Sequence, residues 1–152
     1  MRQTHLLTSF ALILLCGACG ILWEFRENHE LDEWQWTQGD AQIFTYKNEE
    51  EQHLDASLLL RHLHGFQYPS IQIECKVVSP DTAFTVSFTV PVRDEQGDYL
   101  GEGSVDLWDL SVPFLQSHLF SPGVHEFQIS QSTANPLSLI MEVGLELNRA
   151  SE

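Results

Sequence analysis

The chain has 152 residues, of which 43% are apolar and 19% charged, and its net charge is −15. This length favours a single domain, and the apolar share is too high for a disordered chain. Aromatic residues make up 11% of the sequence, which favours a β fold over a helical bundle. The acidic excess excludes binding to nucleic acid or to an anionic membrane surface, because both need clustered lysine or arginine.

The amino-terminal segment has the pattern of an export signal. Arg2 precedes an apolar run at residues 6–15, which is long enough for a signal-peptide core and too short to span a membrane. The run ends in Cys16-Gly17-Ala18-Cys19, which resembles the lipobox of bacterial lipoproteins, with Cys16 at a position where leucine is usual. An ordinary secretory signal or a retained hydrophobic anchor is the alternative. We predict a lipoprotein signal peptide at residues 1–18 and lipidation of Cys19.

Charge and cysteine content also differ between the residues before Cys19 and those after it. Arg2 is the only charged residue before Cys19, so the remainder has six basic and 22 acidic residues and a net charge of −16. Cleavage before Cys19 would leave Cys75 without an intramolecular disulfide partner. Because Cys75 falls on the apolar side of an alternating segment, we predict a buried, unreactive thiol.

Residues 19–40 are mixed and acidic, and we predict that they form the lipidated cysteine and a tether before a domain at residues 41–150. In that domain apolar residues recur with a period of two, which is typical of strands with one buried face. Glycine and proline turns separate these segments. The pattern predicts an all-β, antiparallel β-sandwich of about seven or eight strands. The expected strands are residues 42–46, 57–63, 70–77, 84–90, 104–108, 124–130 and 137–147.

Two segments depart from simple alternation. Residues 57–63 are apolar on both faces, which indicates a central strand. Residues 110–120 form an apolar connector that could contain a short helix. If this connector covers the end of the sandwich, its side chains belong to the core. If it is exposed, Phe114, Leu115 and Leu119 form a docking patch for a partner protein.

The sequence has no recognised catalytic motif. It contains no Gly-x-Ser-x-Gly, no His-Glu-x-x-His and no glycine-rich phosphate loop. We therefore predict a protein that is not an enzyme and has no cofactor. His62 and His64 are two apart and could bind zinc if His53 came near, but paired histidines beside a turn are more often plain surface residues.

Two further clusters have a functional and a structural interpretation. Asp94, Glu95 and Asp98 crowd one turn but lack the spacing of a calcium loop, so we predict no metal site. Aromatic side chains could stack on sugar rings, which gives the alternative function of a lipid-anchored carbohydrate-binding β-sandwich, or they could fill the core and its ends. The aromatic candidates are Trp34, Trp36, Tyr68, Tyr99 and Trp108.

Three stretches of the carboxyl-terminal half carry a family likeness. They are the segment from Gly97 to Gly103, the segment from Phe120 to Gln131, and the strand that ends Val143-Gly144-Leu145-Glu146-Leu147. Together with Leu58-Leu59-Leu60-Arg61 and Tyr68-Pro69, they resemble the gliding-motility lipoprotein GldH family of the Bacteroidota. Departing from the family, the chain has Ser132-Thr133 where an arginine often follows the glutamine. The motif residues that carry the resemblance are Gly97, Tyr99, Leu100, Gly101, Gly103, Gly123, Gln131 and Gly144.

The resemblance implies a lipoprotein of the outer membrane that faces the periplasm. It implies a structural or interaction component of the gliding apparatus, linked to type IX secretion, without enzymatic activity or cofactor. The implied partners are other envelope proteins of the gliding machinery and the membrane itself, through the amino-terminal lipid. The glycines have a structural explanation of their own: Gly97 permits a tight hairpin, and Gly101 and Gly103 permit a bulge or a close backbone approach.

Overall fold

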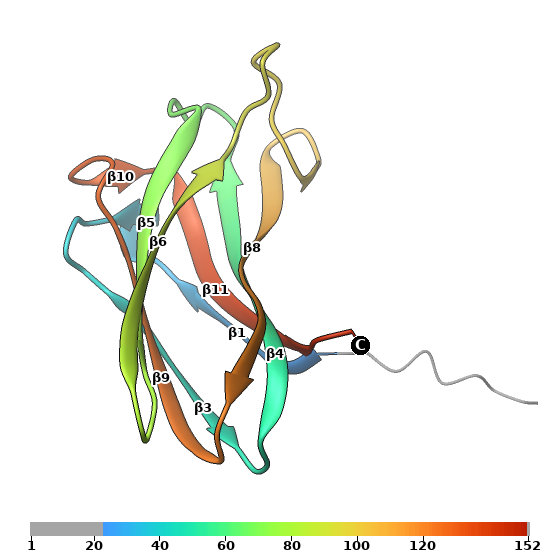
Figure 1. The fold of residues 1–152 in the computed structure, drawn as a ribbon. Coiled ribbons are helices and arrows are strands. Elements are labelled where there is room, and N and C mark those ends of the chain that lie inside the picture. Colours follow the sequence, from blue (N-terminus) through green and yellow to red (C-terminus); the bar gives the residue numbers. More distant parts are fainter. Residues whose placement is uncertain (1–22, 152) are drawn as a thin grey trace, which may run out of the picture.

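The computed structural model describes residues 23–151, which form an antiparallel β-sandwich of two main sheets (Figure 1). The all-β fold expected from the alternation is confirmed. The first sheet has the order β1-β11-β4-β8-β7 and the second has the order β3-β9-β5-β6, while β2 and β10 form a small additional ladder. The elements are β1 (Trp23–Glu30), η1 (Asp32–Trp34), β2 (Gln35–Trp36), β3 (Gln42–Asn48), β4 (Gln52–Leu63), β5 (Ser70–Val78), β6 (Ala83–Pro91), β7 (Glu102–Gly103), β8 (Leu107–Phe120), β9 (Gly123–Gln131), β10 (Leu137–Ser138) and β11 (Ile140–Arg149).

The core lies between the two main sheets and is built from the alternating apolar residues. In β5, Ile71, Ile73, Cys75 and Val77 are buried, and the polar residues between them point to solvent. Burial raises the pKa of the Cys75 thiol to about 12. The thiol therefore stays protonated near neutral pH, as the sequence predicts for an unreactive core cysteine.

Strand β4 is the centre of the first sheet, as its apolar character on both faces indicates. It pairs with β11 on one side and with β8 on the other. Leu58 and Leu60 point into the core. Leu59 lies on the opposite face, where it is only 7% exposed and lines a hollow in the outer face of the sheet.

The expected tether is corrected over most of its length, because residues from Trp23 onward belong to the folded domain. Strand β1 pairs with β11 along its length, and Leu31 and Trp36 are buried in the core. The Trp36 indole nitrogen donates a hydrogen bond to the Asp40 carbonyl oxygen at 2.8 Å. The predicted signal peptide and Cys19 lie outside the described residues.

The connector at residues 110–120 is also corrected, since it is part of the long strand β8 and contains no helix. Its alternation is obscured because the β4–β8 ladder shifts register twice around Ala56. Ser117 has a φ of 47° in the same region. These bulges turn successive apolar side chains to different faces. The expected strand at 104–108 is wrong for its first three residues, because residues 104–106 form the turn between β7 and β8, and β8 begins only at Leu107.

The glycines near the β6–β8 connection have two different local roles. Gly97 and Gly101 both have a φ of +89°, a conformation that glycine adopts without strain. A Cβ at Gly97 would meet open space, whereas a Cβ at Gly101 would clash with the carbonyl oxygen of Asp109 and lie 2.8 Å from Leu110. Gly101 therefore permits the close backbone approach that the spacing of the glycines suggests.

These two glycines form a matched pair for measuring the cost of that approach. Gly97→Ala should lower the free energy of unfolding by about 1 kcal/mol, the cost of left-handed backbone alone. Gly101→Ala should lower it by about 2–4 kcal/mol, because overpacking against the β8 backbone adds about 1–3 kcal/mol. Urea denaturation of both variants measures the difference, and equal losses would contradict the close-approach explanation.

Candidate functional site

The outer face of the first sheet carries a row of charged residues that crosses its strands. In the strand order β1–β11–β4–β8–β7, each of these residues is the cross-strand partner of the next one. We call this set the charged row; it consists of Glu30, Glu142, Arg61, Asp109 and Glu102.

Arg61 is the centre of the charged row. Its guanidinium donates two hydrogen bonds to Asp109, from Nε at 2.7 Å and from Nη2 at 3.1 Å, and one to Glu142 at 2.8 Å. The hydrogen bond to Asp109 is the main cause that raises the pKa of Arg61, with further contributions from the charges of Asp109 and Glu142. Such bidentate pairing fixes the position of the guanidinium.

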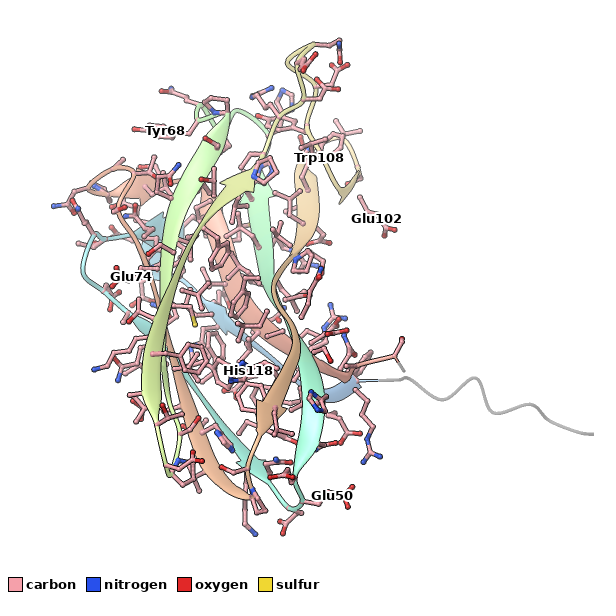
Figure 2. All side chains as sticks on the ribbon, in the orientation of Figure 1. Glu50, Tyr68, Glu74, Glu102, Trp108 and His118 are labelled. Carbon is pink, nitrogen blue, oxygen red and sulfur yellow. The ribbon has the colours of Figure 1, made fainter. Side chains whose placement is uncertain are left out.

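The charged row has more acid than base. Glu102 stands opposite Asp109, and Glu30 stands opposite Glu142. Like charges in directly opposed positions of a sheet destabilise it, and Arg61 is the one basic member among four carboxylates. Glu102 projects away from the body of the sandwich (Figure 2).

Beside the charged row lies a hollow of about 360 Å³. Leu59 and Gly144 form adjacent positions on this face, and Asn28 from β1 lies over Gly144, where a Cβ would approach the carbonyl oxygen of Glu27 to 2.8 Å. Asn28 donates a hydrogen bond to Glu142 at 3.0 Å. The lining combines the apolar Leu59 with groups of both charges: the carboxylates of Glu102, Asp109 and Glu142 and the guanidinium groups of Arg26 and Arg61.

A second surface lies where β6 and β8 approach one another from the two sheets. Phe88 and Phe114 stack with ring centroids 4.9 Å apart and nearly parallel planes, and Phe84 packs against His118 at 4.8 Å. We call these four residues the aromatic seam. Residues 82–92 and 110–117 around it contain no charged side chain, so the seam is a neutral strip on an acidic protein.

The residues expected as a docking patch divide between core and surface. Phe114 and Leu115 are half-buried and pack against the core. Leu119 is 48% exposed. Both interpretations of this segment therefore apply in part, and Phe114 links the core to the aromatic seam.

The tryptophans expected for a sugar platform do not share an exposed face. Trp36 is fully buried, whereas Trp34 is 45% exposed. Trp108 is half-buried, and its ring covers Gly103 and packs against Tyr99 at 5.2 Å. Tyr99 donates a hydrogen bond to the Phe66 carbonyl oxygen and accepts one from the Gly65 backbone. The rings of Tyr99 and Trp108 therefore pack at one end of the sandwich, which agrees with the structural alternative that aromatic side chains fill the core and its ends.

The histidines expected as possible zinc ligands are separated by the fold. His62 is fully buried at the end of β4, His64 is exposed in the following turn, and His53 lies near the opposite end of the strand with Nδ1 against the Ser117 carbonyl oxygen. Across residues 23–151 no cluster of three or more His, Cys, Asp or Glu side chains could hold a metal ion. In the crowded turn, Asp94 instead accepts hydrogen bonds from the backbone of Gln96 and Asp98.

His62 has an unusual environment for a titratable group. Its Nδ1 lies 3.0 Å from the Leu63 carbonyl oxygen, and its Nε2 is buried without a hydrogen-bond partner among the described residues. Phe66 and Tyr99 pack around the ring. Desolvation by burial is the main cause that lowers the pKa of His62. The hydrogen bond to the Leu63 carbonyl oxygen opposes this shift, the charge of Arg93 lowers the pKa further, and the charge of Asp109 raises it.

Sequence reasoning identified Arg61 and Gly144 only as parts of motif stretches, and it did not single out Glu30, Asn28, Glu102, Asp109 or Glu142. Their association depends on strand register across five strands, which no local pattern reports. The one available signal was the single arginine that ends the apolar run at 58–60 on a central strand.

Comparison with known proteins gives one family. The family model described as GldH lipoprotein matches residues 24–147. No curated protein matches the chain. Within residues 23–151, no helix has the length and apolar character needed to cross a membrane.

The charged row predicts a salt-dependent loss of stability. Arg61→Gln leaves Asp109 and Glu142 without the cation that they share, so the free energy of unfolding should fall by about 1 kcal/mol at low salt and by less at 1 M salt, where the repulsion is screened. Arg26→Gln, which removes one exposed pair with Glu146, is the matched control and should cost about 0.5 kcal/mol or less. Urea denaturation at both salt concentrations measures this, and equal losses in the two variants would contradict the shared-cation explanation.

His62 predicts a loss of stability in acid. Because its folded pKa is lowered from the ordinary 6.5, the unfolded chain binds the proton more readily. Its contribution is therefore complete above about pH 6.5 and is lost as the pH falls from that value toward the folded pKa. His62→Gln should flatten this slope. Adding His118→Gln should flatten it further, because burial and the charges of His53 and His125 lower the pKa of His118. Thermal unfolding across the pH range measures the slope, and an unchanged slope in His62→Gln would contradict the argument.

Proposed function

The chain belongs to the GldH lipoprotein family, and we propose that it is an outer-membrane-anchored lipoprotein of the gliding motility apparatus. In this role it faces the periplasm and acts as a structural and interaction component linked to type IX secretion. The family match over residues 24–147 is the observation that carries the proposal.

The amino-terminal sequence supports the anchoring part of the proposal. Signal-peptide cleavage before Cys19 and acylation of that cysteine would leave only three residues between the lipidated cysteine and Trp23, where β1 begins. Two or more acyl chains on one residue give stable membrane attachment that a single chain does not. On this proposal, the folded domain is held close to the membrane, since the expected long tether is part of the sandwich.

The two surfaces described above support the interaction part. The charged row and the hollow provide a polar surface that carries both charges, and the aromatic seam provides a neutral strip. Both are suited to binding protein side chains. We propose that the partners are other envelope proteins of the gliding machinery.

The cysteine pair at the lipobox provides a matched test of anchoring. In cells, Cys19→Ser should release the protein from the membrane fraction and reduce surface spreading, because the acylation site is lost. Cys16→Ser should leave both unchanged, because this residue lies in the removed segment. Membrane fractionation and mass spectrometry of the mature amino terminus give the readout. An unmodified terminus at a residue other than Cys19 would overturn the anchoring proposal.

Deletion of the gene tests the proposed apparatus. Cells that lack the protein should fail to spread on surfaces and to secrete adhesins, and the wild-type gene should restore both. Crosslinking in the native envelope, followed by identification of the attached proteins, should recover components of the gliding machinery. Normal spreading and secretion in the deletion strain would contradict the proposal.

A further inference from the structure

We propose that the outer edge of β6 is a docking site for an extended strand of a partner protein, which adds to the second sheet by β-augmentation. This inference rests on the proposed role as an interaction component and names the site and the chemistry of the partner. Main-chain hydrogen bonds supply affinity in this mode of recognition, and alternate side chains supply specificity.

The backbone of β6 is ready to accept another strand. Among the described residues, β6 pairs only with β5, through nine consecutive positions without a shift in register. Val92 donates its backbone N–H to the Pro69 carbonyl oxygen on the β5 side, at 2.9 Å. Because N–H groups alternate in direction along a strand, those of Thr85, Ser87 and Thr89 point away from β5. Their side chains are exposed.

This edge lacks the features that prevent strand pairing elsewhere in the protein. Folded proteins protect sheet edges with charges, lysine, proline or bulges. Strand β1 has four charged residues and an irregular register, β3 carries Lys47, and β8 has bulges and Pro113. Strand β6 has none of these before its last residue, Pro91. It is rich in threonine, valine and phenylalanine, residues that favour strands.

An added strand would meet two different rows of side chains. On the inner side it would extend over the half-buried Phe84, Val86 and Phe88, next to the aromatic seam with Phe114. On the outer side it would lie beside Thr85, Ser87 and Thr89. The partner segment therefore has apolar residues at alternate positions and threonine, serine or valine between them.

Charge indicates that the partner strand has basic ends. The edge itself is neutral over residues 82–92, but Asp81 precedes it and Asp94, Glu95 and Asp98 follow it. Arg93, which lies between, is held over the Tyr99 ring at 3.8 Å and bonded to the carbonyl oxygens of Gly97 and Phe66. Lysine or arginine at the ends of the incoming strand would complement these carboxylates. A second copy of this chain, with a net charge of −15, would bring like charges together.

The site can be tested with the full-length chain in detergent and a labelled nine-residue peptide of alternating valine and threonine with a lysine at each end. Fluorescence anisotropy gives the affinity, and hydrogen–deuterium exchange should show protection at residues 83–91. Ser87→Pro removes an outward N–H without breaking the β5–β6 ladder and should weaken binding by about tenfold or more. Thr45→Lys adds a lysine to β3, at the other edge of the same sheet, and should leave binding unchanged.

A Ser87→Lys variant and a peptide with glutamate at both ends complete the design. The variant should also lose affinity, and the glutamate peptide should bind about tenfold more weakly than the lysine peptide. Retained binding by both Ser87 variants, protection outside β6, equal affinity for the two peptides, or no peptide binding at all would overturn the proposal. So would light scattering that shows a dimer abolished by Ser87→Pro, since a second copy would then occupy the edge. If these binding results are negative but the deletion strain fails to spread, the β6 site is wrong and the proposed function is still supported.

Discussion

The pairing of β4 with β11 and β8 determines where every candidate surface lies. One face of this long central strand supplies Leu54, Leu58 and Leu60 to the core, and the other face places Leu59 and Arg61 on the outside of the sheet. The same ladder brings Glu142 and Asp109 to opposite sides of Arg61. Because side chains alternate with a period of two, a shift of one residue would move Arg61 into the core and Leu60 to the surface. Register is therefore the constraint on which both packing and charge placement depend.

Alternation predicted the parts of the fold in which one face of a strand is uniformly apolar, such as β5 and β6, and it predicted β4 as central from its two apolar faces. It missed β1 because this strand lies at the edge of the first sheet, where four of its eight residues are charged and Phe25 is the apolar residue packed against the core. It misread β8 because two register shifts and the backbone of Ser117 break the period. Edge position and bulges are properties of the assembled sheet, and a local pattern contains neither.

The candidate site was predictable only in fragments for the same reason. Gly101 and Gly144 were singled out as motif residues, and their surroundings explain why glycine is needed: the backbone of Asp109 lies against one, and Asn28 lies over the other. The charged row combines residues from five strands, of which only β7 and β8 are neighbours in the sequence. A lone arginine at the end of an apolar run indicates a special position on a strand. It does not identify Asp109 and Glu142 as partners, because that requires the register of two ladders.

The distribution of charge determines which strands the unprotected edge of β6 can accept. Salt reduces electrostatic interactions to a range of about 8 Å at physiological ionic strength. The overall charge of −15 therefore does less to prevent acidic strands from pairing with β6 than the carboxylates that lie next to its two ends. These repel acidic strands, including a second copy of the chain, and attract strands with basic ends. Local lysines or bulges would block every strand alike. Acid placed at the ends of a neutral edge discriminates between strands by charge, which makes the edge selective.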